Sequence, residues 1–192
     1  MEQNNEMTAR QSLALISETL NNSRKSILRN NAKYYILWGG LLTAFSLAVF
    51  LLWRQTGSAA WNFLWFAMPV IGYPLAFLLG RKDVSVPKSF IGNLTGKVWA
   101  VFAAFSITLS ALAVTVVPMP ITFLIILLLG VAESISGVIL KNWPIIICGF
   151  ILGVGGAVAA TMLSETSAQM LLFTFGGVLL AATGLIVKYQ YR

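Results

Sequence analysis

The chain lacks histidine altogether, has a single cysteine, Cys148, and is poor in charge, with only 10% of its 192 residues being Asp, Glu, Lys or Arg. One cysteine excludes an internal disulfide, and the absence of histidine removes the commonest metal ligand and general base. A soluble domain keeps about a quarter of its residues charged. Because 58% of the residues here are hydrophobic, the composition predicts an integral membrane protein.

Recognisable catalytic groups are missing as well. The cysteine has no histidine partner, and no second carboxylate accompanies the one acid inside an apolar run, Glu133. The stretch LGVGGAV, residues 152–158, is similar to a glycine-rich nucleotide turn, but Val158 stands at the last glycine position and the stretch lies in an apolar run. The sequence therefore predicts a non-enzymatic protein with no cofactor and no metal site.

The net charge of +7 is the usual footprint of nucleic-acid binding, but its distribution argues against that function. The Lys and Arg residues lie between or beside the apolar segments, where positive charge sets membrane orientation and attracts anionic headgroups. We therefore expect the lipid bilayer as a partner, and no nucleic acid.

Six segments are apolar over the roughly 20 residues that a helix needs to cross the hydrocarbon. They cover residues 34–53, 60–80, 98–117, 121–140, 143–162 and 170–187. The third and fourth are separated only by Pro118-Met119-Pro120, which predicts a tight turn because two prolines so close break a helix. The sequence thus predicts an all-α fold: residues 1–33 as an N-terminal segment and residues 34–192 as a six-helix membrane bundle.

The basic residues also predict the orientation of these spans. With the N-terminus in the cytoplasm, all Lys and Arg residues except Arg54 fall on the inner side of the membrane. So strong a bias favours an even number of spans with both termini cytoplasmic. The predicted location is the cytoplasmic (inner) membrane of a bacterium.

The N-terminal segment carries its own pattern. Thr8 and Gln11 fit a capping box, and an apolar stripe follows at spacings of three, four and seven. The stripe consists of Leu13, Ile16, Leu20 and Ile27, and a basic stripe of Lys25, Arg29 and Lys33 leads into the first span. These patterns predict an amphipathic helix, with a break at residues 21–23. It either lies on the inner leaflet, with the basic stripe on lipid headgroups, or docks a soluble partner or a second subunit.

Small residues line two of the later spans. Gly149, Gly153, Gly156 and Ala160 form a stripe on the fifth span, and Gly177, Ala181 and Gly184 form one on the sixth. Such stripes let helices approach closely, so we expect these two to pack on each other. In the second span, Pro69, Gly72 and Pro74 predict a kink or a broken stretch. A break of this kind either is structural or lines a substrate path.

Glu133 is the residue that most needs an explanation. It lies about 10 Å from the cytoplasmic end of its span, on one helical face with Gly130, Ser134 and Gly137. Reflection about the short turn at Lys141 places Ser134 level with Gly149, and Gly130 level with Gly153. A glycine-rich seam should therefore bury the acid in its neutral form. The carboxyl group either bridges two helices through a hydrogen bond or serves as a protonation site in a permeation or sensing path.

Two blocks of sequence resemble a family of uncharacterised small bacterial membrane proteins. They are QSLALISETLNNSRKSILRNNAKYYILWG and GVAESISGVILKNWPIIICGFILGVGGAVAA. In that family a short helix precedes several spans, and a segment of the form G-x-x-x-x-I-S-G-x-I-L-K comes late. Its members are often encoded beside small winged-helix regulators, which implies a cytoplasmic protein partner. The shared motifs are packing motifs and imply no functional residues.

Two functions remain open at this stage. In the first, the inner face of a non-enzymatic membrane protein engages a cytoplasmic regulator or anionic lipid. In the second, a small-solute or proton-coupled transporter or channel uses Glu133 and the second span. The sequence also leaves open whether the chain acts alone or as a homo-oligomer, since a bundle of this size could line a path only between subunits.

Overall fold

The computed structural model describes residues 9–81, 90–117 and 119–191, and this part of the chain is helical, with no strand. The elements are α1 (Ala9–Thr56), η1 (Ala59–Phe63), α2 (Leu64–Gly80), α3 (Phe90–Thr115), α4 (Ile121–Leu140), α5 (Trp143–Phe150), η2 (Ile151–Gly155), α6 (Gly156–Met162) and α7 (Thr166–Gln190). Within the described residues, six helical segments are long and apolar enough to cross a membrane. The prediction of an all-α chain with six candidate spans is confirmed.

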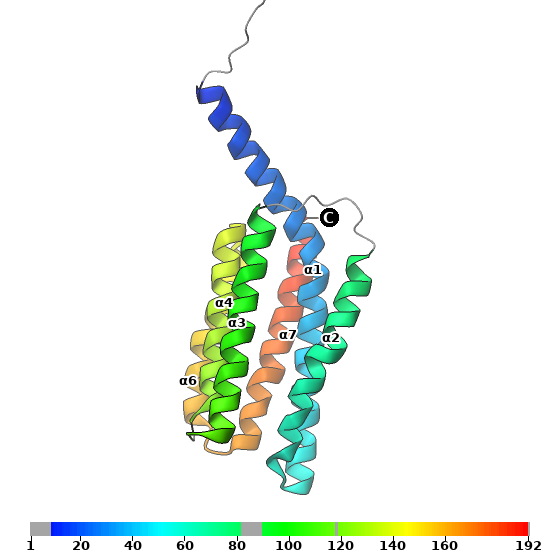
Figure 1. Cartoon of the computed structure of the whole chain (residues 1–192), viewed down its shortest axis with the longest axis vertical. Coiled ribbons are helices and arrows are strands. Elements are labelled where there is room, and N and C mark those ends of the chain that lie inside the picture. Colours follow the sequence, from blue (N-terminus) through cyan, green and yellow to red (C-terminus); the bar gives the residue numbers. More distant parts are fainter. Residues whose placement is uncertain (1–8, 82–89, 118, 192) are drawn as a thin grey trace, which may run out of the picture.

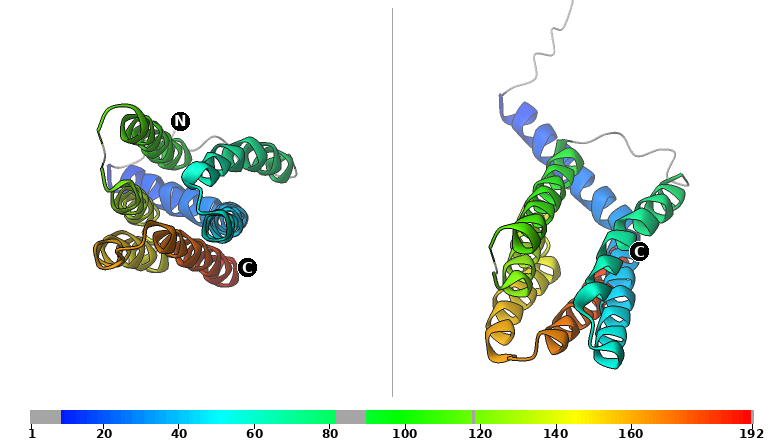
Figure 2. Two further views of the ribbon diagram at one scale, coloured as in Figure 1. Left: turned by 90° about the horizontal axis from the view of Figure 1, so that it is seen from below. Right: turned by 60° about the horizontal axis from the view of Figure 1, so that its bottom comes forward.

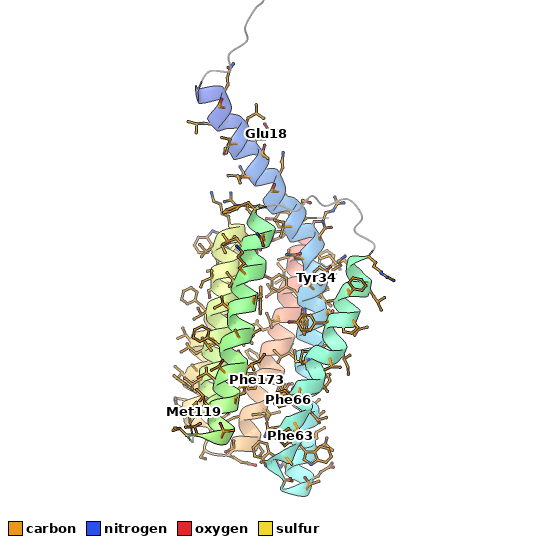
Figure 3. All side chains as sticks on the ribbon, viewed as in Figure 1. Glu18, Tyr34, Phe63, Phe66, Met119 and Phe173 are labelled. Carbon is orange, nitrogen blue, oxygen red and sulfur yellow. The ribbon has the colours of Figure 1, made fainter. Side chains whose placement is uncertain are left out.

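The helices run up and down, so their connections gather at two opposite ends (Figure 1). At one end lie η1 and the turn that contains Met119, whose side chain is labelled in Figure 3 together with Phe63 of η1. At the other end lie the C-terminus and the turn between α4 and α5. Lys141 in that turn takes the left-handed conformation with φ 51°, and Asn142 caps α5 by accepting a hydrogen bond from the backbone N–H of Ile145 at 3.2 Å.

Four of the six spans form the centre of the bundle. Helix α1 lies alongside α7, and α4 lies alongside the span built from α5, η2 and α6 (Figure 2). Helix α2 packs on the outside of α1, and α3 packs on the outside of α4. The most apolar stretch of each span is 44%, 39% and 44% buried in α4, α5–α6 and α7, but only 6% in α2 and 0% in α3. The protein core is therefore made by the central helices.

Helix α1 continues without interruption from Ala9 to Thr56, so the break predicted at residues 21–23 is wrong. Asn and Ser each destabilise a helix by only a few tenths of a kcal/mol relative to alanine. The long helical segments on both sides of residues 21–23 overcome this cost. The N-terminal part of α1 extends beyond the ends of the other helices (Figure 1). Burial begins at Ile27 and Leu28, which are 5% and 1% exposed. Thr8 of the predicted capping box lies outside the described residues.

The third and sixth spans have boundaries that differ from those predicted, and the fifth has the predicted boundaries but an irregular interior. The third begins at Phe90 rather than at residue 98, because the polar stretch before residue 98 continues the helix. The sixth covers Thr166–Gln190 and is longer at both ends. In the fifth, the wider π-helical turn η2 interrupts the α-helix at Ile151–Gly155, a feature that periodicity in the sequence does not reveal.

Helix α2 is continuous through both of its prolines, so the predicted broken stretch is absent there. Gly72 is the buried residue between Pro69 and Pro74, and the ring of Trp38 on α1 occupies the space where its side chain would stand. The glycine therefore allows the indole of α1 to lie directly against the backbone of α2. This contact makes the proline-containing segment part of the packing between α1 and α2.

Candidate functional site

The seam between α4 and the fifth span has the predicted pairing. A Cβ atom added at Gly149 would overlap Ser134, and one added at Gly130 would overlap the backbone of Gly153. One turn further on, a Cβ at Gly137 would come within 2.7 Å of the backbone nitrogen of Ile146. The two helices thus meet backbone to backbone. We call these six residues the hairpin seam, because a turn of two residues joins its two helices.

The small-residue stripe of the sixth span has a different partner from the one predicted. Gly177 lies against Gly39 and Thr43 of α1, and Gly184 lies against Ala32 and Tyr35 of the same helix. The expectation that this stripe packs on Gly149, Gly153 and Gly156 is therefore wrong. Gly153 meets Gly130, and Gly156 meets the side chain of Ile126, both on α4.

We call this second contact the terminal seam, because it joins the first and last spans. It is formed by Gly39, Thr43, Gly177, Ala181 and Gly184, and a Cβ at Gly39 would come within 2.5 Å of the backbone nitrogen of Ala181. Both stripes were identified correctly as packing surfaces. Their pairing with each other was predicted wrongly, because a small-residue stripe can pack closely against many different helices.

Glu133 is fully buried, with 0% of its surface exposed, and neither carboxyl oxygen has a hydrogen-bond partner in the described part of the chain. The predicted burial is confirmed, but a bridging hydrogen bond is not formed.

This carboxyl group interacts electrostatically with two side chains on other helices, and a third side chain lies beside one of them. Tyr35 of α1 and Cys148 of α5 both lie within electrostatic range of Glu133. Thr183 of α7 lies beside the thiol of Cys148 and donates its hydroxyl to the carbonyl of Leu179 at 2.9 Å. We call Glu133, Tyr35, Cys148 and Thr183 the central polar cluster.

Sequence reasoning missed most of this cluster. Tyr35 is 8% exposed although its position at the end of a span is typical of an interfacial aromatic residue. Cys148 and Thr183 are single polar groups in apolar runs, a pattern that carries no information about which helix they face. Ser136 was also missed: it is fully buried and donates to the carbonyl of Ala132 at 2.7 Å.

The hollow lined by Pro120, Phe123, Ala160, Thr161 and Gln169 does not include any residue of the cluster. The carboxyl oxygens of Glu133 have no accessible surface. Among the described residues, no group of three His, Cys, Asp or Glu side chains could hold a metal ion.

The basic stripe of the N-terminal segment has mixed surroundings. Lys25 and Arg29 are exposed, in keeping with a role at lipid headgroups or a partner surface. Lys33 instead donates to the carbonyl of Leu79 at 2.9 Å, and Arg24 donates to the carbonyl of Ile139 at 3.2 Å. These two carbonyls lie in the last turns of α2 and α4, where cations offset the negative end of a helix dipole. Arg24 and Lys33 thus anchor α1 to the ends of two other helices.

Among the described residues, six helices are long and apolar enough to cross a membrane, which is the composition of a multi-pass membrane protein. Comparison of the chain with protein families, characterised proteins and solved structures gave no match.

Proposed function

We propose that this chain is a non-enzymatic protein of the bacterial cytoplasmic membrane, with both termini in the cytoplasm, whose projecting helix engages a soluble cytoplasmic protein. The orientation is supported by the charge bias, since Arg54 is the one basic residue at the end of the bundle that carries η1 and the turn at Met119. It can be tested with a reporter fused to the C-terminus that fluoresces only when it folds in the cytoplasm. A dark fusion that is present in full length would contradict it.

The observation that carries the function is the continuity of α1 beyond the bundle. Residues 11–26 form about 24 Å of helix before burial begins at Ile27. Leu13 and Ile16 on this segment are 67% and 57% exposed. Figure 3 shows Glu18 on the same segment, well beyond the ends of the other helices. A helix that leaves the bundle along its own axis carries the apolar stripe away from the hydrocarbon, so a protein surface is the better cover for it.

The chemistry of the stripe indicates the kind of partner. Leu13, Ile16 and Leu20 recur at spacings of three and four, which is how an amphipathic helix fills an apolar groove of another protein. Lys25 and Arg29 are exposed further along the same helix but on the face opposite the stripe. We therefore expect the partner to offer an apolar groove to the stripe alone.

The test places a photo-crosslinking side chain at position 16 and, as a matched control, at position 15. Leu15 is 51% exposed but points away from the stripe. In bacterial cells that express the full chain, we expect a soluble-protein adduct from position 16 that Leu13→Ser abolishes and Leu15→Ser retains. Adducts with lipid only, or with a second copy of the chain, would contradict the proposal.

Truncation gives an independent check. Removal of residues 1–19 should abolish recruitment of the soluble protein to the membrane and leave membrane insertion intact. The deletion should stop before Arg24, since this residue and the buried Ile27 and Leu28 belong to the bundle. A truncated chain that still recruits the soluble partner would overturn the role of the projecting helix.

A second candidate function is favoured by one observation, the carboxyl group of Glu133 without a hydrogen-bond partner inside the bundle. Groups of this kind in membranes often belong to ion or proton paths, which supports a proton-coupled transporter of small solutes. In proteoliposomes, Glu133→Gln should then abolish pH-dependent flux. Wild-type vesicles that show no flux under either a proton or a solute gradient would exclude this candidate.

A further inference from the structure

The central polar cluster lies where four helices meet. Glu133 comes from α4, Tyr35 from α1, Cys148 from α5 and Thr183 from α7, and all four residues are 8% exposed or less. Helices α4 and α7 make little direct contact. Glu133 of α4 interacts electrostatically with Tyr35 of α1 and Cys148 of α5, and Thr183 of α7 lies beside Cys148. The carboxyl group is therefore positioned to affect all four central helices at once.

The energetic problem is the charge of the carboxyl group. A carboxylate buried without a hydrogen bond or a cation costs far more free energy than the neutral acid in the same place. In the described residues, the titratable side chains that interact with Glu133 are Tyr35 and Cys148, and no Lys or Arg does so. Helix α7 contributes only the uncharged hydroxyl of Thr183, and none of α3, η2 and α6 contributes an interacting charge. The closed arrangement therefore fits the protonated acid alone.

In the described part of the chain, the two helices beside the cluster are joined by packing contacts and not by side-chain hydrogen bonds. The hairpin seam beside Glu133 consists of glycine contacts and has no hydrogen bond between its two helices among the described side chains. The π-helical turn η2 begins three residues after Cys148 and includes Gly153, which lies against Gly130. Turns of this kind are less stable than α-helix and occur often at functional positions.

We propose that Glu133 is a proton-binding site whose occupancy keeps the junction of α1, α4, α5 and α7 closed. Loss of the proton to solvent leaves a carboxylate that the closed junction does not accommodate, so the junction opens and water reaches the cluster. The closed state is therefore favoured at low pH and loses stability as the pH rises. This inference concerns opening of the bundle and is independent of the projecting helix and of any transported solute.

Cys148 is a built-in reporter of this opening, because it is the only cysteine and belongs to the same cluster. The experiment measures the rate at which N-ethylmaleimide alkylates Cys148 in proteoliposomes between about pH 5 and pH 9. Glu133→Gln is the matched control, since it keeps the shape of the neutral acid and has no proton to lose. The ratio of the wild-type rate to the variant rate removes the ordinary pH dependence of the thiol reaction.

We expect this ratio to rise with pH, by at most about tenfold per pH unit for a single linked proton. A ratio that is constant with pH would overturn the proposal, and so would fast labelling of both proteins at every pH. If Glu133→Gln does not fold, the reference becomes Ser17→Cys in a Cys148→Ala chain, with its thiol on the exposed part of α1. Labelling of wild-type Cys148 should then rise more steeply with pH than labelling at position 17, and parallel profiles would overturn the proposal.

Discussion

The two close-packed seams of this protein use different means to hold two helices together. In the hairpin seam, Gly130 and Gly149 bring backbones into contact, and a turn of two residues connects the helices. In the terminal seam, the helices are separated by more than a hundred residues, and side chains bond across the contact. Ser46 of α1 and Thr174 of α7 share a hydrogen bond of 2.9 Å, and Thr43 lies 3.5 Å from the carbonyl of Thr174.

The difference follows from how each pair finds its partner. A short turn keeps two helices at a high effective concentration, so packing alone is enough to fix their register. Helices from opposite ends of a chain must select each other among several apolar surfaces. Glycine makes close approach possible for many partners, whereas a buried hydroxyl pair is satisfied in one register only. The terminal seam thus combines close packing with a specific polar contact, as a distant pairing requires.

The largest effect should come from filling the hairpin seam. In Gly130→Ala, the new methyl group would overlap the backbone of Gly153 and lie 2.5 Å from the carbonyl oxygen of Gly149. Neither backbone can move away without shifting a whole helix. We expect the free energy of unfolding to fall by about 3 kcal/mol, measured by SDS titration in mixed micelles. Gly155→Ala is the control, since nothing lies within 4 Å of its Cβ position, and an equal loss in both variants would refute the seam.

The terminal seam should be less sensitive to the same change. In Gly39→Ala the nearest atoms are the backbone nitrogen of Ala181 at 2.5 Å and the carbonyl oxygen of Gly177 at 2.6 Å. We expect a loss of about 2 kcal/mol in the same titration. The adjacent Gly40 has open space around its Cβ position, so Gly40→Ala should leave the free energy of unfolding nearly unchanged. If Gly40→Ala costs as much as Gly39→Ala, the loss reflects the backbone of α1 and not its contact with α7.

The turn of the hairpin seam offers a smaller and separate test. Asn142→Ala removes the cap of α5, a hydrogen bond of 3.2 Å from Ile145 N–H to the side-chain oxygen. The expected loss is about 1 kcal/mol, and Asn142→Asp should retain most of the stability because a carboxylate also caps a helix. Thermal melting followed by circular dichroism can compare the two variants. Equal melting temperatures for the Ala and Asp variants would show that the cap contributes nothing.

The smallest effect should come from the polar contact of the terminal seam. Ser46→Ala removes the hydrogen bond to Thr174, and such bonds within membranes contribute about 0.6 kcal/mol. A double-mutant cycle with Thr174→Val isolates the pair, since Ser46 also bonds to the carbonyl of Leu42 at 2.6 Å. A coupling energy of zero in the SDS titration would remove the contrast between the two seams.

The predictable part of the site is the part that lies close together in the sequence. The register of the hairpin seam followed from reflection about Lys141, because two antiparallel helices joined by two residues have one possible alignment. The same reasoning indicated that Glu133 is buried. It did not indicate which other helices lie near the carboxyl group, because α1 and α7 are far from α4 in the sequence.

The sequence by itself determined the six apolar helices, their approximate limits and the surfaces on which they approach closely. These features depend on the residue composition of each segment and on its local periodicity. Only the tertiary structure decided that α7 packs on α1, that α1 leaves the bundle as one unbroken helix, and that Glu133 interacts with Tyr35 and Cys148. The physical reason is that small-residue stripes and single polar groups are compatible with many helix partners, and the choice among them depends on all the helices packing at once.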